Sequence, residues 1–243
     1  MKKYYQRDAL VFTSNTPISE VKTFIKEHPV FVKKIGKSSL GKGVSKVDLS
    51  EGVYQGKHSI EQLVRKWLSE GEDLLLEELV VQSHFMSEFN PSSVNTIRVI
   101  SFLTKSGIIT PYAFFKTGKA GSFVDNGGAG GILIGIDSKT GELITDGIDE
   151  KRNIYVAHPD TGKRYKGAIL PDWSQAIDLC KKMALELPSV KMVGWDLAHT
   201  EKGWILIEAN ERSQIVGPQL IFNRGLRQEL TEIMNQMDLY IPY

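Results

Sequence analysis

The sequence predicts an α+β fold built mainly on antiparallel sheet, and two observations support this class. Apolar segments typical of strands mix with amphipathic helices without a strict β-α-β alternation. Hairpin patterns, in which two apolar segments flank a short polar turn, dominate the second half of the chain. The 243 residues contain no internal repeat, low-complexity tract or long linker, so any domain boundary should lie inside compact structure.

The first predicted elements are a helix and a strand. Thr16 and Pro17 fit the N-cap and the first position of a helix with one apolar face, which should end at His28-Pro29. Val30–Ile35 then has the composition of a strand and leads into the loop GKSSLGKG.

A second helix and strand follow. Ser59 and Gln62 have capping-box spacing, and apolar residues recur at helical spacing from Ile60 until Gly71 should end the helix. Leu74–Gln82, with the sequence LLLEELVVQ, is a short apolar segment typical of a strand.

The second half predicts two hairpins, a glycine-dense loop and two helices. The first hairpin joins Val94–Phe102 to Ile108–Phe115, and a loop with the sequence VDNGGAGG lies between Gly118 and Gly131. The predicted elements that come after this loop are a strand at Ile132–Ile136, a helix at Trp173–Leu187, a hairpin at Gly194–Asn210 and a helix from about Gln219 to Met237.

Composition excludes several classes of protein. Hydrophobic residues make up 41% and charged residues 24%, and 30 basic residues against 29 acidic residues leave a net charge of +1. We therefore expect no general affinity for nucleic acid, and no membrane insertion because no apolar segment is long enough. One cysteine, Cys180, excludes an internal disulfide and fits a reducing compartment, so we expect a cytoplasmic protein.

The hairpin GWDLAHTEKGWILIEAN carries the sharpest functional signal. Glu208 and Asn210 share one strand face because they lie two residues apart. A three-residue loop, Glu201-Lys202-Gly203, would place Asp196 opposite Glu208, whereas a two-residue turn would pair Asp196 with Ile207. Two carboxylates and an amide oxygen on one spot suit Mg²⁺. The alternative is that these side chains line a solvated sheet face.

Three further segments add polar groups to otherwise apolar or glycine-rich sequence. FVKKIGKSSLGKGV places a lysine on a strand before a glycine loop that could cradle phosphate, although it lacks the P-loop pattern and also fits an ordinary turn. In VNTIRV, Asn95 and Arg98 should face opposite ways, and Arg98 suits either an anion or an internal ion pair. Of Glu77 and Glu78, one must face inward.

Taken in order, these segments resemble the ATP-grasp superfamily over nearly the whole chain. The segments SVNTIRV, VDNGGAGG, HPDTG, GWDLA and LIEAN are similar to the sugar-transfer-associated ATP-grasp family, which is linked to bacterial cell-surface polysaccharide gene clusters. The resemblance implies an ATP-grasp fold of two α+β subdomains with the nucleotide between them. The smaller subdomain would span residues 1–80 and the larger residues 81–243.

The resemblance also implies site residues. For the nucleotide, the implied contacts are Lys33 at the phosphates, the loop residues Ser38, Ser39, Gly41 and Gly43, and the hinge residues Glu77, Glu78, Leu79 and Val80. Asp196, Glu208 and Asn210 would hold Mg²⁺. Arg98 would meet the γ-phosphate or the transferred group, Arg212 could bind a substrate carboxylate, and Asn126, beside Asp125, would lie near the acceptor.

Two departures from the wider superfamily bear on the acceptor. ATP-grasp ligases commonly carry a further domain before the lysine strand, whereas about thirty residues precede Lys33 here, so either the chain is truncated or the acceptor site is built differently. Ligases of the D-alanine type have an arginine two residues before the first metal aspartate, and here Gly194 takes that position.

The implied activity is that of an ATP- and Mg²⁺-dependent ligase, in which a carboxylate is activated as an acyl phosphate and then attacked by an amine. Its substrates would be a small-molecule or sugar-linked carboxylate and an amine. One alternative is a kinase acting on a hydroxyl, with His158 or Asp125 as general base. The other is a non-catalytic nucleotide-binding relic, which should lack one or more metal ligands.

Overall fold

The computed structural model describes residues 2–36, 43–50, 60–71, 73–119, 130–211 and 213–237. The chain forms two compact units. We call Arg7–Val81 the small unit, and Met1–Gln6 together with Gln82–Tyr243 the large unit. The first helix, α1 (Lys2–Tyr5), belongs to the large unit, where the Tyr4 hydroxyl donates a hydrogen bond of 2.6 Å to Glu186.

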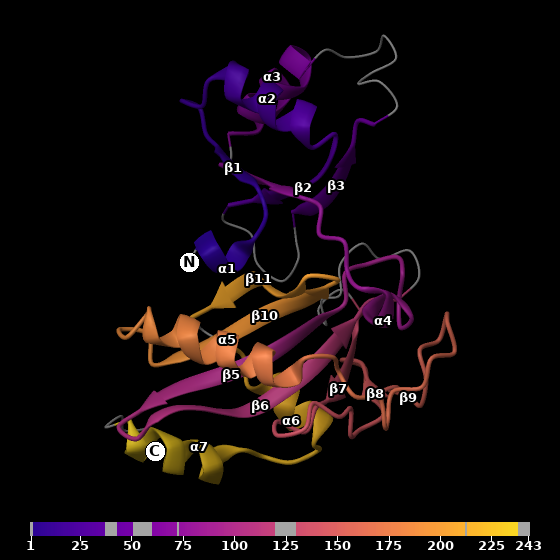
Figure 1. Ribbon diagram of the computed structural model, residues 1–243, viewed down its shortest axis with the longest axis vertical. Coiled ribbons are helices and arrows are strands. Elements are labelled where there is room, and N and C mark those ends of the chain that lie inside the picture. Colours follow the sequence, from indigo (N-terminus) through magenta and orange to yellow (C-terminus); the bar gives the residue numbers. More distant parts are fainter. Residues whose placement is uncertain are drawn as a thin grey trace. The chain divides into compact units, whose positions relative to one another are not determined.

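The small unit is a four-stranded antiparallel sheet in the order β1-β4-β2-β3. These strands are β1 (Ala9–Phe12), β4 (Leu74–Glu78), β2 (Val30–Ile35) and β3 (Val44–Asp48). The helices α2 (Ile18–Glu27) and α3 (Ile60–Glu70) lie together over the sheet (Figure 1). Phe12, Phe31 and Trp67 pack edge to face in the core beneath them. One face of this sheet is therefore covered by helices of its own unit.

The large unit is built on a seven-stranded antiparallel sheet in the order β11-β10-β5-β6-β7-β8-β9. Its strands are β5 (Thr96–Thr104), β6 (Gly107–Thr117), β7 (Ile132–Gly135), β8 (Gly147–Ile148), β9 (Ile154–Tyr155), β10 (Met192–Thr200) and β11 (Gly203–Asn210). A short helix, α4 (His84–Ser87), precedes β5. The expected antiparallel architecture is confirmed in both units.

Helices cover the two faces of the large sheet unequally. The helix α5 (Trp173–Leu185) lies along one face, while α6 (Val216–Ile221) and α7 (Arg227–Gln236) lie on the other side of the sheet (Figure 1). Trp195 and Cys180 are fully buried in the core under α5, as their positions in the sequence predict. The core under α6 and α7 is smaller and includes Ile100 and Phe114. The remainder of this second face carries the polar side chains that form the candidate site.

Three predicted elements differ from the structure. The helix α2 begins one residue later than expected, because Pro17 occupies the N-cap and the Thr16 hydroxyl instead accepts a 2.8 Å hydrogen bond from the Thr13 N–H. The strand β4 ends at Glu78, where its pairing with β1 and β2 runs out. The last helix is two helices, since Asn223 adopts a left-handed conformation with φ of +47° between α6 and α7.

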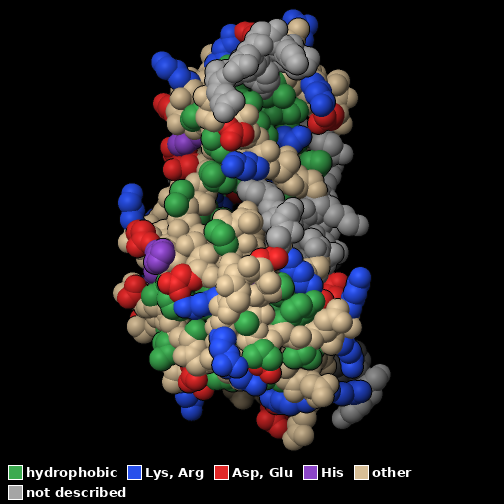
Figure 2. Space-filling model, turned by 90° about the vertical axis from the view of Figure 1, so that its right-hand side faces the viewer, with side chains coloured by type: hydrophobic (Ala, Val, Ile, Leu, Met, Phe, Trp, Pro, Cys, Tyr) green, Lys and Arg blue, Asp and Glu red, His purple; other side chains and the backbone are tan. Residues whose placement is uncertain are grey.

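Charge is evenly distributed over the visible surface. On the face drawn in Figure 2, acidic and basic side chains of the described residues intermingle, in line with the net charge of +1. Within the described ranges, no helix has both the length and the apolar character needed to cross a membrane.

Candidate functional site

The β10–β11 hairpin places Asp196 directly opposite Glu208, but by a different route from the one the sequence suggested. The turn has two residues, because Thr200 pairs with Gly203, and the glycine has φ of +107°. A bulge then shifts the register, so that Leu197 pairs with Leu206 while Asp196 pairs with Glu208. The predicted three-residue loop is therefore wrong, and the extra residue at Ile207 restores the pairing that the loop was expected to provide.

The three oxygen-bearing side chains share one face of the hairpin and differ in exposure. Asp196 is only 3% exposed, Asn210 is half-buried and Glu208 is exposed. Trp195, the neighbour of Asp196, points to the opposite face and donates a 2.8 Å hydrogen bond from its indole N–H to Ser101. The cluster therefore runs from a buried carboxylate to one that reaches water.

Asp196 is held by two basic side chains from the neighbouring strands. Arg98 donates from Nε to Oδ1 at 2.7 Å and from Nη2 to Oδ2 at 2.5 Å, and Lys116 donates from Nζ to Oδ2 at 3.1 Å. Burial disfavours the charged carboxylate, but the charges and hydrogen bonds of Lys116 and Arg98 outweigh it and hold the pKa of Asp196 below its usual range. The internal ion pair considered for Arg98 is therefore present.

Asn210 connects Glu208 to the basic side chains. With its amide oriented to satisfy both ends, Asn210 donates to Glu208 Oε1 at 3.3 Å and accepts from Arg98 Nη2 at 3.2 Å. Carboxylate and amide oxygens are the ligands that Mg²⁺ prefers, and adjacent arginine and lysine side chains suit phosphate oxygens. The donor set on this face therefore fits a magnesium ion together with a phosphorylated ligand.

Lys116 is a member of this cluster that the sequence interpretation missed. It lies on β6 next to β5, and only 5% of the residue is exposed. The sequence feature that could have identified it is a lysine in the apolar strand segment AFFKT, because a buried charge requires a partner. Two other expected residues of this unit, Asn126 and Arg212, and also Asp125, lie outside the described residues.

The small unit has a charge cluster of its own around Glu77, which is 3% exposed. Lys34 Nζ lies 2.7 Å from Glu77 Oε2, and Arg7 Nη2 lies 3.3 Å from Oε1. Burial lowers the pKa of the Arg7 guanidinium to about 10, which leaves it charged at neutral pH. Glu77 is thus the buried member of the Glu77-Glu78 pair, although it lies on the sheet face opposite the core residue Phe31.

Lys33 and Lys34 lie on opposite faces of the small sheet. Lys33 is two residues from the core residue Phe31 and points the same way, toward the helices, with its Nζ 5.8 Å from the Trp67 ring centre and 3.8 Å from Glu70. Lys34 pairs with Leu75 and lies on the other face, beside Glu77. Lys33 therefore lies on the face that α2 and α3 cover, and Lys34 lies on the opposite face.

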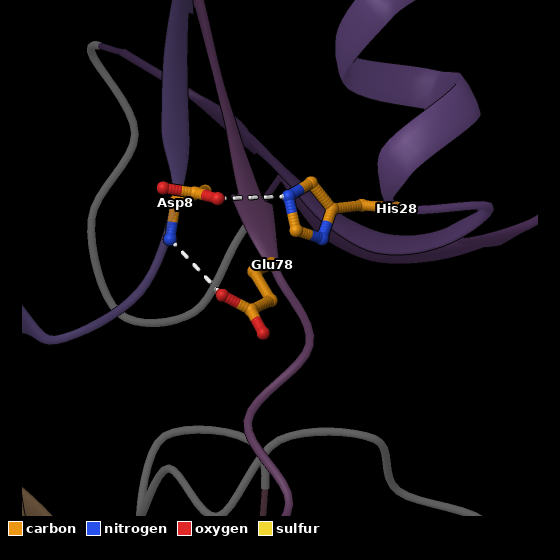
Figure 3. Close-up of side chains that lie close together, drawn as sticks. All are labelled: Asp8, His28 and Glu78. Carbon is orange, nitrogen blue, oxygen red and sulfur yellow. Dashed lines mark hydrogen bonds and ion pairs between the residues drawn. The ribbon is translucent and has the colours of Figure 1, made fainter.

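The expected hinge residues form the end of β4 and the segment after it. Glu78 accepts a 3.1 Å hydrogen bond from the Asp8 N–H, and Asp8 in turn contacts His28 Nε2 at 3.2 Å (Figure 3). These contacts connect the end of β4 to the residue before β1 and to the end of α2. Leu79 and Val80 follow as half-buried residues outside any strand.

The loop expected to cover the phosphates is described only at its end. Ser38, Ser39 and Gly41 lie outside the described residues. Gly43 directly precedes β3 and has φ of +75°, and its carbonyl accepts a 3.2 Å hydrogen bond from the Ile35 N–H.

His158, considered as a general base for a kinase, is enclosed by the protein. Its side chain is fully buried, Nε2 lies 2.8 Å from the Gly118 carbonyl oxygen, and Nδ1 accepts from the Asp160 N–H at 3.3 Å. Both ring nitrogens are therefore engaged inside the large unit, which does not suit proton transfer with an external acceptor.

The sequence and the fold both match known proteins. The family model described as sugar-transfer associated ATP-grasp matches residues 6–235. No curated protein sequence matches the chain.

Three similar solved structures share the ATP-grasp fold. The ATP-grasp ligase PsnB complexed with minimal precursor, Mg and ADP is 13% identical, with a TM-score of 0.52 over 95% of this chain and 53% of that one. D-alanyl-alanine synthetase A from Vibrio cholerae is 12% identical, with a TM-score of 0.53 over 96% and 61%. Carboxyaminoimidazole ribonucleotide synthase from Aspergillus clavatus, complexed with ATP, is 12% identical, with a TM-score of 0.52 over 99% and 50%. The chain thus spans between half and about three-fifths of the length of these proteins.

Proposed function

The chain belongs to the sugar-transfer associated ATP-grasp family, and we propose that it is an ATP- and Mg²⁺-dependent ligase that joins a carboxylate to an amine. The observation that carries this proposal is the cluster on the β10–β11 hairpin. Asp196, Glu208 and Asn210 offer oxygen ligands on one face, and Arg98 and Lys116 bring positive charge to the same spot. Oxygen ligands for a hard cation, next to cations for phosphate, are what phosphoryl transfer requires.

The proposal also assigns nucleotide-binding groups to the small unit. In the small unit, Lys34 meets the phosphates, in place of Lys33, because it lies on the sheet face that the helices leave open. The main chain of Glu78, Leu79 and Val80 holds adenine, and the loop with Ser38, Ser39, Gly41 and Gly43 covers the phosphates. Two of the similar structures support a nucleotide role, since one was solved with Mg and ADP and another with ATP.

The reaction has two steps, both of which depend on controlling negative charge. A carboxylate oxygen of the first substrate attacks the γ-phosphorus of ATP, the bond to the β,γ-bridging oxygen breaks, and ADP leaves. The amine nitrogen then attacks the acyl carbon, inorganic phosphate leaves, and the nitrogen loses a proton. Mg²⁺ bound at Asp196, Glu208 and Asn210 would neutralise phosphate charge, while Arg98 and Lys116 stabilise the charge on the transferred phosphoryl oxygens. Arg212 is proposed to bind the substrate carboxylate, and Asn126 to lie near the acceptor.

The proposed acid is a sugar-linked carboxylate, such as a uronic acid, or an amino acid, in cell-surface polysaccharide modification. This choice rests on the family description alone, which associates the fold with sugar transfer. The similar structures are consistent with varied acceptors, since their names describe a precursor-bound ligase, a D-alanyl-alanine synthetase and a ribonucleotide synthase.

A kinase on the same fold is less well supported. It needs a general base near a hydroxyl acceptor. Of the two candidate bases, His158 is buried with both nitrogens engaged, and Asp125 lies outside the described residues. A non-catalytic relic is also disfavoured, because it should lack one or more metal ligands and all three candidate side chains are present on one face of the hairpin.

Trapping with hydroxylamine tests the proposal without knowledge of the natural amine. The protein is incubated with ATP, Mg²⁺, hydroxylamine and a panel of uronic acids and amino acids. A ligase forms an acyl phosphate that hydroxylamine converts to a hydroxamate, with one ADP and one phosphate released per hydroxamate. A phosphoester stable to hydroxylamine, formed on a hydroxyl without release of free phosphate, would replace the proposal with the kinase.

A further inference from the structure

Ser213 lies against the candidate site at a position that only a glycine partner allows. A Cβ atom added to Gly194 would stand 2.3 Å from Ser213 Oγ and 3.5 Å from Arg98 Cδ. Gly194 and Asp196 are two residues apart on β10 and so face the same side of the sheet. The missing side chain of Gly194 therefore makes room for the Ser213 hydroxyl on the face that carries the cluster.

The Ser213 hydroxyl is buried and has no hydrogen-bond partner among the described residues. Ser213 is 7% exposed, and its Oγ makes no hydrogen bond within the described residues. The other buried serines of the described ranges behave differently, because each hydroxyl is hydrogen bonded: Ser83 to His199, Ser93 to Asn90 and Ser101 to Trp195. An unmade hydrogen bond of this kind costs about 1–3 kcal/mol, so its presence beside a binding site points to a partner supplied by the ligand.

The surroundings indicate an anionic partner. The space left by Gly194 adjoins both the Ser213 hydroxyl and the aliphatic part of Arg98, whose guanidinium holds Asp196 together with Lys116. Phosphate oxygens accept hydrogen bonds and carry negative charge, so they suit a hydroxyl donor that lies near two basic side chains. Arg98 and Lys116 supply positive charge, and the hydroxyl supplies a neutral hydrogen-bond donor for a phosphate oxygen.

We propose that the Ser213 hydroxyl donates a hydrogen bond to an oxygen of the γ-phosphoryl group of bound ATP. This inference rests on the proposed function and extends it, because it adds a residue that distinguishes ATP from ADP. Gly194 is a positioning residue in this arrangement. Any side chain there displaces the hydroxyl.

The experiment compares two nucleotides that differ in the γ-phosphoryl group. Calorimetry gives the affinities of the full chain for Mg·AMPPNP and Mg·ADP, and the readout is their ratio. Ser213→Ala should lower the affinity for Mg·AMPPNP by roughly tenfold to a hundredfold, the effect of one hydrogen bond to a charged group, and leave that for Mg·ADP within about twofold. A purely structural role would shift both affinities or neither.

Two further variants separate the hydroxyl from general packing. Ser101→Ala removes a buried, hydrogen-bonded hydroxyl from the opposite sheet face, so it should lower stability without changing the ratio. The double variant Gly194→Ala with Ser213→Gly fills the space without a clash but lacks the hydroxyl, and should show the same change in ratio as Ser213→Ala.

The failure of this inference differs from failure of the proposed function. Wild-type protein that binds both nucleotides, with an unchanged ratio in Ser213→Ala, would overturn the role of Ser213 and leave the nucleotide site intact. Wild-type protein that binds neither nucleotide would overturn the proposed function, and the role of Ser213 with it.

Discussion

Each unit of the molecule buries one carboxylate between an arginine and a lysine, yet the side chains around the two carboxylates differ. In the small unit Glu77 is held by Arg7 and Lys34, and in the large unit Asp196 is held by Arg98 and Lys116. Both acidic residues are 3% exposed. The two clusters differ in the other side chains that lie near each carboxylate.

Around Asp196 the same sheet face adds Glu208 and Asn210, so further oxygen ligands and a second negative charge join the cluster. Around Glu77 the adjacent acid, Glu78, faces the other way, because it pairs with the core residue Phe31. The contacts described for the Glu77 cluster join two basic side chains to one carboxylate, and the charge of Glu78 also acts on Arg7. The Asp196 cluster balances its charges and retains an exposed carboxylate, which suits a cation. A buried ion pair alone does not identify a ligand; the side chains beside it on the same face do.

Removing each buried carboxylate should have the largest effect. Asp196→Asn leaves Arg98 and Lys116 buried without their negative partner, which should cost about 3–5 kcal/mol of unfolding free energy. Glu77→Gln should cost less, about 2–3 kcal/mol, because the side chain of Lys34 is 25% exposed and reaches water. Urea unfolding measures both, with Trp67 fluorescence reporting the small unit and Trp195 fluorescence the large unit, each in a background where the other tryptophans are replaced by phenylalanine.

An exposed ion pair provides the control for these losses. Lys22 on α2 contacts Glu61 on α3, and both side chains are more than 40% exposed. Glu61→Gln should change the unfolding free energy by less than about 1 kcal/mol. A loss as large as that of Glu77→Gln would show that burial does not decide the cost.

The two neighbouring lysines of β2 test which face of the small sheet binds nucleotide. Lys34→Ala should weaken Mg·AMPPNP by about tenfold, because it removes a cation from the open face. Lys33→Ala should stay within about twofold of wild type and lower stability slightly, since Lys33 contacts Trp67 and Glu70. The reverse order of affinities, measured by calorimetry, would return the phosphate contact to Lys33.

Lowering the pH should have a smaller effect on the unfolding free energy than these substitutions. The pKa of Asp196 in the folded protein lies below its ordinary value of 3.8, so its ion pairs stabilise the fold fully above that pH. This contribution is lost as the pH falls from about 4 through the lowered pKa. Asp196→Asn, already less stable at pH 7, should therefore lose less on acidification than wild type. If the unfolding free energy measured with urea falls equally with pH below about 4 in the two proteins, this assignment is wrong.

Much of the fold was predictable because apolar periodicity reports which faces are buried. The helix from Ile60, the β5–β6 hairpin and the inward-facing Trp195 follow from such patterns. β1 and β3 were missed, since neither has a pattern that stands out from its flanking loops. The break between α6 and α7 depends on one left-handed residue, Asn223, in a sequence that is otherwise compatible with a helix.

The candidate site was predicted in part, and the errors have one physical origin. The spacing of hydrophobic residues along a strand shows which sheet face each residue lies on, but it does not show how neighbouring strands are aligned with one another. The bulge at Ile207, the orientation of Lys34 against Lys33 and the approach of Lys116 to Asp196 all depend on register or on strand order. The close approach of Ser213 to Gly194 joins a strand to a segment that follows the next strand, and no local pattern signals it.

The most direct measurement of the central claim is calorimetric binding of AMPPNP, with and without Mg²⁺, to wild type and to Glu208→Gln. Glu208 is exposed, so this substitution should leave the fold intact, and Glu150→Gln, another exposed acid of the large unit, controls for the lost charge. The account predicts Mg²⁺-dependent binding by wild type and Glu150→Gln, weakened at least about tenfold in Glu208→Gln. Binding that is equally tight in all three proteins, or that is indifferent to Mg²⁺, would contradict a metal site on the β10–β11 hairpin.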